Sequence, residues 1–437
     1  MTDLIVIGAG PGGYELALEA SHNGLSTVLI EGKKLGGTCL QEGCIPTKTY
    51  YKNASVLNTI KEAGLYGINI PSYDFDFSKV VERKEKVVHE LEKGILFLLN
   101  KAGVKVVNGY ASFLSPSEVE VNGTVYQAKK IVIATGSVPI ILPAFPDALT
   151  STDLLNLSAV PEKLVVIGGG VIGIEMASIF SSFGSDVTVV EATDSIIGLA
   201  DSYISKRLLA YLKAKGIKFY LNAKAQKHEN SQVTIATEKG EIMLDATQVL
   251  MAVGRRPNLN NLGLENAHVE YTKRGIVTNE FGQTSNPNIY AIGDVTGINM
   301  LAHYATYDGL RVLNHIMGKP NNIRFDLVPA CVFTFPEVAW CGKTEQELAR
   351  EGINYQTHKG MFRANGKALA MNETDGFAKI ITVDNLIAGV HIIGPSASTL
   401  VHELSSLMNL DITKDRFLSI IHAHPTLSEI FTSTLKQ

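Results

Sequence analysis

Two closely spaced cysteines are the residues of this 437-residue chain best suited to chemistry. Cys39 and Cys44 are separated by four residues and lie in the glycine-rich stretch 36–48. A disulfide between them would close a ring too small to stabilise the fold much, so its use would be redox chemistry. The spacing is too wide for a zinc knuckle, and no other Cys or His flanks it, so no metal site is expected. Two unpaired thiols near a helix start explain the spacing equally well.

An internal repeat with an offset of 160 residues predicts the elements that would position these cysteines. An apolar strand, a Gly-x-Gly-x-x-Gly turn, a helix and a second strand ending in an acid occur twice. Such a turn lets the backbone approach a pyrophosphate at the helix N-terminus, and the acid can accept hydrogen bonds from ribose hydroxyls. The sequence therefore predicts two dinucleotide sites. Their residues are Gly8, Gly10, Pro11, Gly12, Gly13 and Glu31 in the first copy, and Gly168, Gly170, Gly173, Glu175 and Glu191 in the second.

The residues after Glu191 indicate which nicotinamide cofactor is preferred. The stretch 192–197 contains no Arg or Lys. A 2′-phosphate is normally met by an arginine near this position, so the acid and the missing base favour NAD over NADP.

Other candidate ligand positions lie where buried strands break. One strand ends in Ala134, Thr135, Gly136 and Ser137, and its counterpart in the second copy ends near Gly254. A third short strand ends at Asp294, which could hold a sugar-alcohol hydroxyl or could equally cap a helix. The next helix is expected to open at Met300, Leu301, Ala302 and His303, with its N-terminus stabilising negative charge on a nearby ring.

Composition and patterning set the fold class. Hydrophobic residues make up 45% of the chain and charged residues 19%, with 39 glycines, which is typical of a well-packed α/β protein. The net charge of −4, without a long basic run, gives no sign of a nucleic-acid or membrane partner. We expect helices over residues 50–100 and an antiparallel pattern from about residue 325. The first strand begins almost at Met1, which predicts a cytoplasmic protein without a signal segment.

Together these motifs resemble the pyridine nucleotide–disulfide oxidoreductases over essentially the whole chain, and most closely their dihydrolipoamide dehydrogenase branch. The motifs at 36–46, 291–294, 300–303, 391–395 and 422–429 carry the resemblance. It implies two Rossmann-like folds, for FAD and NAD, plus a C-terminal α+β dimerisation domain. The implied division is residues 1–145 and 263–324 for FAD, 146–262 for NAD and 325–437 for the interface of an obligatory homodimer.

The resemblance also implies a role for each site residue. Cys44 would face the flavin and Cys39 would exchange with the substrate, dihydrolipoamide free or on a lipoyl domain of a 2-oxo acid dehydrogenase complex. His424, oriented by Glu429, would be the acid/base acting in the other subunit. A thiolate is the competent nucleophile, and histidine is suited to making one near neutral pH. Further cofactor contacts would come from Gly37 and Thr38, from Lys48 paired with Glu175, and from Val171 beside the nicotinamide.

Two features temper the resemblance. Gln41-Glu42 stands between the cysteines where dihydrolipoamide dehydrogenases usually carry Asn-Val, and Thr47 stands where they carry Ser. The added charge of Glu42 could raise the thiol pKa values or point harmlessly outward. An NAD(P)H-dependent reductase of another disulfide, and a flavin-binding subunit without activity, are the alternative interpretations.

Overall fold

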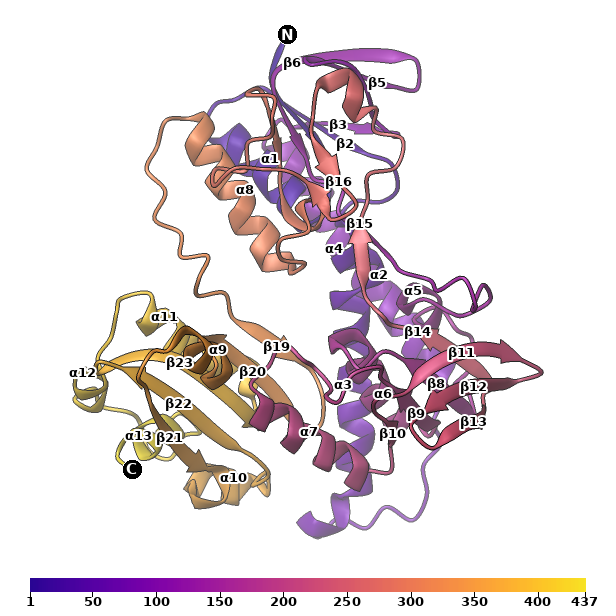
Figure 1. Cartoon of the computed structure of the whole chain (residues 1–437), viewed down its shortest axis with the longest axis vertical. Helices are drawn as coiled ribbons and strands as arrows, with labels where there is room; N and C mark the ends of the chain where they lie inside the picture. Colours follow the sequence, from indigo (N-terminus) through magenta and orange to yellow (C-terminus); the bar gives the residue numbers. More distant parts are fainter.

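The computed structural model describes all 437 residues, and three sheets organise it (Figure 1). The first is a parallel sheet in the order β3-β2-β1-β6, with β18 on the far side of β6. Residues 4–7 of its β1 (Thr2–Ile7) are all apolar and buried, as expected of a strand covered on both faces. The remaining strands are β2 (Thr27–Glu31), β3 (Lys105–Asn108), β6 (Thr124–Ile133) and β18 (Ile289–Ala291). Beyond β6, β5 (Glu118–Val121) pairs antiparallel with β6, and β4 (Ser112–Ser115) pairs antiparallel with β5.

The two faces of this first sheet are covered differently: residues of α1, α4 and α8 pack on one face, and residues of β4, β5 and η2 pack on the other. On one face α1 packs against α8. The long pair α3 and α4 runs from this fold down to the second (Figure 1). The bounds are α1 (Pro11–His22), α2 (Gly37–Glu42), α3 (Cys44–Lys61), η1 (Ala63–Tyr66), α4 (Phe77–Lys101), η2 (Leu264–Ala267), η3 (Gly293–Thr296) and α8 (Ala302–Ile316), with a small hairpin of β16 (Tyr271–Thr272) and β17 (Gly275–Ile276).

The second sheet repeats the first on a smaller scale. Its four strands are parallel in the order β10-β9-β8-β14, and α6 follows β8 as α1 follows β1. Its core is shared with α3 and α4 through a cluster of aromatic rings that includes Tyr50, Phe77 and Phe180. The elements are α5 (Ser151–Leu154), β8 (Lys163–Ile167), α6 (Val171–Phe183), β9 (Asp186–Val190), α7 (Ser202–Ala214), β10 (Lys218–Tyr220), β11 (Lys224–Glu229), β12 (Gln232–Thr237), β13 (Gly240–Asp245) and β14 (Gln248–Met251).

The chain crosses between the two nucleotide-type folds twice, and the two crossings pair with each other. They form an antiparallel ribbon of β7 (Ser137–Pro139) and β15 (Arg255–Pro257), in which Ser137 faces Pro257. Each strand directly follows the end of a sheet strand, β6 and β14 respectively. Residues at the carboxyl ends of both sheets are therefore joined at this ribbon.

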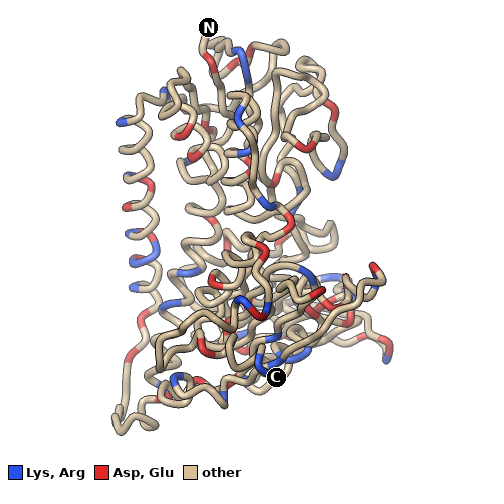
Figure 2. The backbone as a smooth tube through the Cα atoms, turned by 90° about the vertical axis from the view of Figure 1, so that its left-hand side faces the viewer, with Lys and Arg blue, Asp and Glu red and all other residues tan.

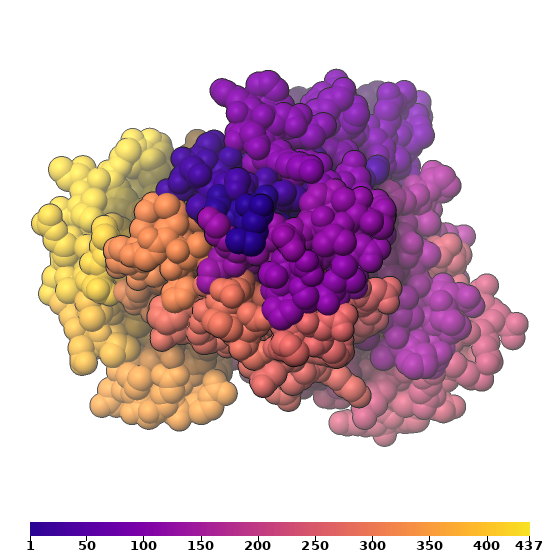
Figure 3. Space-filling model, turned by 90° about the horizontal axis from the view of Figure 1, so that it is seen from above, coloured from indigo at the N-terminus to yellow at the C-terminus, as the bar shows by residue number.

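The third sheet is antiparallel in the order β19-β20-β23-β22-β21, with α11 and α13 packed against it. It stands to one side of the nucleotide-type folds (Figure 3). Its elements are β19 (Ala330–Val332), β20 (Glu337–Gly342), α9 (Glu345–Glu351), β21 (Gln356–Met361), η4 (Phe362–Ala364), α10 (Gly366–Met371), β22 (Phe377–Val383), β23 (Leu386–Gly394), α11 (Ala397–Met408), α12 (Lys414–Leu418) and α13 (Glu429–Leu435). The residue boundaries expected at 145, 262 and 324 stay a prediction.

Surface charge is mixed. Basic residues are interspersed with acidic ones along the backbone rather than gathered in one block (Figure 2). None of the helices is both long enough and apolar enough to cross a bilayer.

Candidate active site

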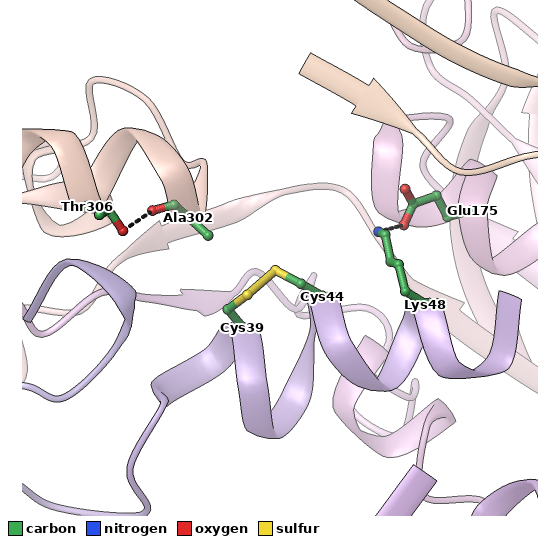
Figure 4. The surroundings of a disulfide bond; sticks show 6 residues. All are labelled: Cys39, Cys44, Lys48, Glu175, Ala302 and Thr306. Carbon is green, nitrogen blue, oxygen red and sulfur yellow. Dashed lines mark hydrogen bonds and ion pairs between the residues drawn. A yellow bond between two sulfur atoms is a disulfide. The ribbon is translucent and has the colours of Figure 1, made fainter. Parts of the chain in front are cut away.

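The two cysteines are joined by a disulfide at the break between α2 and α3 (Figure 4). Gly43 ends α2 and Cys44 is the first residue of α3, and the Cα atoms of Cys39 and Cys44 are 4.7 Å apart, within the range of a disulfide. The alternative of two unpaired thiols is therefore wrong. Cys331 and Cys341 are free, and burial raises the pKa of each thiol to about 12.

The disulfide rests on the first glycine turn. A Cβ placed on Gly37 would lie 2.6 Å from the Cα atom of Gly10, so only glycine fits where α2 begins, and its φ of +56° suits glycine as well. Gly36, also left-handed, donates its N–H to the carbonyl of Ala9. The start of the cysteine segment is thus fastened to the turn between β1 and α1.

The two glycine turns have the same construction. Gly8 and Gly168 have positive φ, and a Cβ on either would collide with a carbonyl of the neighbouring strand end, at 2.3 Å in each case. A Cβ on Gly10 or on Gly170 would meet nothing within 4 Å, so a cradle lies open at the N-terminus of α1 and of α6. A diphosphate fits this cradle, since free backbone N–H groups and the positive helix end face it.

The acids that close each second strand also repeat. Glu31 accepts a hydrogen bond from the N–H of Ala9 at 2.7 Å, and Glu191 accepts one from the N–H of Gly169 at 2.6 Å. Each carboxylate therefore lies beside its glycine turn, where a ribose attached to the diphosphate would be. Glu191 has a further partner in Thr193 and no basic neighbour among its hydrogen bonds.

Asp294 is tied to the crossing ribbon and caps no helix. It accepts a hydrogen bond from the hydroxyl of Ser137 at 2.5 Å, while Leu301 is the N-cap of α8, so the capping alternative is wrong. Arg255 donates to both the hydroxyl (2.7 Å) and the carbonyl (2.8 Å) of Ser137. Burial raises the pKa of Asp294, although Ser137 and the charge of Arg255 act in the opposite direction.

The neighbouring predicted residues occupy the same region. Thr135 donates to the carbonyl of Asn258, and Gly136 accepts from the N–H of that residue. His303 shares a hydrogen bond of 2.8 Å with the carbonyl of Pro329, and burial lowers its pKa. Ala302, at the start of α8, lies close to the disulfide (Figure 4).

Lys48 lies one turn after Cys44 on α3 and points to α6 (Figure 4). Its ammonium is 2.8 Å from Glu175 and 4.4 Å from the centre of the Phe333 ring. The second oxygen of Glu175 accepts the N–H of Phe333 at 2.9 Å. Glu175 is buried, with 6% of its side chain exposed. Lys48 comes from the first nucleotide-type fold, Glu175 from the second, and Phe333 from the part with the third sheet, so these contacts join all three parts of the molecule.

His424 and Glu429 pair with each other but not with the cysteines of their own chain. His424 Nδ1 is 2.9 Å from a carboxylate oxygen of Glu429, whose other oxygen accepts the N–H of Thr426. These two hydrogen bonds lower the pKa of Glu429, that from Thr426 most. The His424 side chain is 78% exposed, and α13 lies well apart from α2 and α3 (Figure 1).

Comparison with known proteins identifies the family. Residues 2–309 match the model of the pyridine nucleotide-disulphide oxidoreductases, and residues 328–435 match that family's dimerisation domain. The chain belongs to this family. As a pyridine nucleotide-disulphide oxidoreductase it is a flavoprotein enzyme whose folds take FAD and NAD, and its dimerisation domain supports a homodimer.

Individual relatives cover nearly the whole chain. A dihydrolipoyl dehydrogenase of Chlamydia muridarum is 39% identical over 99% of this chain and 96% of its own. One from Geobacillus stearothermophilus is 41% identical over 98% of this chain and 94% of its own. Among solved structures, the HOCl-induced flavoprotein disulfide reductase RclA of Escherichia coli superposes with a TM-score of 0.88 at 28% identity, covering 99% of both chains.

Sequence reasoning missed several residues that build this site. Arg255 follows the predicted Gly254, but nothing in the pattern Arg255-Arg256 says which arginine turns toward Ser137. Asp308, fully buried on α8, accepts the N–H of Gly293 at 2.9 Å and so holds the turn that carries Asp294. Phe333 gave no signal, because its contacts with Lys48 and Glu175 span about 160 to 290 residues of sequence.

Proposed function

We propose that the chain is a dihydrolipoyl dehydrogenase, which oxidises dihydrolipoamide with NAD⁺. The observation that carries the proposal is the Cys39–Cys44 disulfide seated on the first glycine turn through Gly37. Relatives 37–41% identical over nearly their full length carry that name. The chain would divide into FAD, NAD, central and interface parts at 145, 262 and 324.

The proposed cofactor residues follow from the cradles. FAD would be held by Gly8, Gly10, Pro11, Gly12, Gly13, Glu31, Gly37, Thr38, Lys48, Ala134, Thr135, Gly136, Ser137, Asp294, Met300, Leu301, Ala302 and His303. NAD would be held by Gly168, Gly170, Val171, Gly173, Glu175, Glu191 and Gly254. When bound, FAD supplies an acceptor for the electron pair of the thiols and passes it on as hydride to NAD⁺.

The thiol chemistry falls to the two cysteines. A thiolate of the substrate attacks the sulfur of Cys39, the Cys39–Cys44 bond breaks, and Cys44 leaves as a thiolate. The second substrate thiol then attacks the substrate sulfur bound to Cys39, which closes the substrate disulfide and frees the Cys39 thiol. The substrate loses two electrons and two protons, and the protein disulfide gains the electrons.

Electrostatics suits Cys44 to its role as leaving group. As the first residue of an 18-residue helix, Cys44 lies at the positive end of α3, and the ammonium of Lys48 lies one turn further on. Both features stabilise a thiolate on Cys44 rather than on Cys39.

The proton acceptor would be His424 of the second subunit, with Glu429 fixing its tautomer. His424 is exposed and the pair is distant from its own disulfide, which is what a site shared between subunits requires. We propose that a lipoyl domain of a 2-oxo acid dehydrogenase complex presents the substrate, and that the protein acts in the cytoplasm.

The test is NADH formation from dihydrolipoamide and NAD⁺. The wild type is expected to turn over, Cys44→Ser to lose turnover, and Cys341→Ala, a change to a thiol in another core, to keep it. If Cys44→Ser retained wild-type turnover, the disulfide mechanism would be wrong. Faster reaction of glutathione disulfide with NAD(P)H would instead support the alternative, a reductase of another disulfide.

A further inference from the structure

Glu42 gives the two cysteines different electrostatic surroundings. It is the last residue of α2 and lies three positions after Cys39, which places it one helical turn away on the same face. Side chains at this spacing have Cβ atoms about 5–6 Å apart. The Glu42 side chain is 30% exposed, so water screens its charge only in part.

The positive charges around Glu42 compensate it weakly. Its one ion pair is with Lys33, at 3.3 Å, and that lysine side chain is 68% exposed. An exposed pair of this kind contributes little. Arg255 also lies within the field of Glu42, but its guanidinium donates to Ser137, on the side of Asp294.

Cys44 differs from Cys39 in its position on a helix and in the charge nearest to it. It begins α3, where the helix dipole favours negative charge, whereas Cys39 lies in a helix whose negative end carries Glu42. The charged groups that face the disulfide region from the surrounding elements are Lys33 before α2, Glu42 on α2, Lys48 on α3, Glu175 on α6, Arg255 on β15 and Asp294 on η3. Of these acids, Glu42 is the one whose ion pair is with a mostly exposed lysine.

We propose that Glu42 holds the Cys39 thiol of the reduced protein in its protonated form, so that charge concentrates on Cys44 and Cys39 depends on an added base. This inference rests on the proposed function, in which Cys39 meets the substrate. Glu42 touches no reacting atom and acts as a positioning residue for the proton.

The experiment measures how fast Cys39 is alkylated as a function of pH. Flavin-loaded protein is reduced with dithiothreitol, freed of the reagent and treated with iodoacetamide, which is uncharged. The alkylated peptides are identified by mass spectrometry. The midpoint for Cys39 is the pH at which half of this thiol is ionised, and in Glu42→Gln it is expected to fall by about half a pH unit to one pH unit. Alkylation below the midpoint is then about two- to fivefold faster than in the wild type. At high pH the same variant should react slightly more slowly, because a less basic thiolate is a weaker nucleophile.

Three further variants separate charge from structure. Glu42→Asp keeps the charge and should restore the wild-type midpoint. Lys33→Gln removes the ion-pair partner and should raise the midpoint, whereas Lys33→Gln combined with Glu42→Gln should match Glu42→Gln alone. A wild-type midpoint in Glu42→Gln, or equal midpoints in Glu42→Gln and Glu42→Asp, would overturn the inference. In the proposed assignment the bound flavin covers Cys44 and leaves Cys39 accessible, so alkylation of Cys44 ahead of Cys39 would instead overturn that assignment.

Discussion

Replacing Lys48 by Met should lower the melting temperature of the flavin-loaded protein by about 2–3 °C. Removing one partner of a buried ion pair costs about 3–5 kcal/mol, because the remaining charge is left unpaired. Glu175 is 6% exposed, but the Lys48 side chain is 32% exposed, so water can partly replace the ammonium and about 2–3 kcal/mol is expected. Unfolding 437 residues releases an entropy of about 0.9 kcal/mol/K, which converts this cost into about 2–3 °C.

A double-mutant cycle read by circular dichroism and flavin fluorescence would test this reasoning. Glu175→Gln keeps the shape of the side chain and its contact with the N–H of Phe333, so Lys48→Met combined with Glu175→Gln should regain most of the lost stability. Turnover should stay low in the double variant, because the ammonium beside the proposed flavin site is still missing. If Lys48→Met melted with the wild type, or if the two losses simply added, Lys48 and Glu175 would not be a coupled buried pair.

Three more predictions follow from the same geometry. Because burial raises the pKa of Asp294, its carboxyl loses the proton at a lower pH in the unfolded chain than in the folded one, which destabilises the fold at neutral pH. Asp294→Asn should therefore melt higher than the wild type at neutral pH, and the gain should vanish at a pH below the folded and the unfolded pKa of Asp294. FAD retention during gel filtration should fall in the same variant. NAD⁺ should exceed NADP⁺ by at least about tenfold in kcat/KM, because Glu191 and the residues after it offer a 2′-phosphate no cation, and equal values would contradict this assignment. Lys379→Met should cost about 3–5 kcal/mol in urea unfolding, because the fully buried Asp201 would lose its partner at 2.7 Å, and a change below about 1 kcal/mol would show that water reaches the pair.

The parts of this site that the sequence predicts are those that depend on local pattern. Each glycine turn with its closing acid, and the cysteine segment, is encoded within about 30 residues. The two glycine turns have the same construction in the structure, and so do the contacts of their closing acids. Most of the helical stretch expected over 50–100 lies in α3 and α4, although residues 67–76 interrupt it. Whether Asp294 capped a helix or faced Ser137 could not be decided from sequence, because Ser137 lies 157 residues away.

Contacts between distant segments could not be predicted. The field of Glu42 reaches Arg255 only because β15 returns from the second fold beside β7. The sequence pattern does not show which side chain of Arg255-Arg256 contacts Ser137. It also does not distinguish Asp308 from an ordinary polar residue on the exposed face of an amphipathic helix. Such groups become visible once the ribbon and α8 are placed around the turn at Gly293.

Mixed dimers test the central claim, an active site that uses the cysteines of one subunit and the histidine of the other. Subunits carrying Cys44→Ser and subunits carrying His424→Gln are each expected to be inactive in dihydrolipoamide oxidation by NAD⁺. Co-expressed with two different affinity tags and isolated as the mixed dimer, they should regain about half of the wild-type activity, because one of the two sites then contains both intact residues. A mixed dimer as inactive as its parents would contradict the shared site.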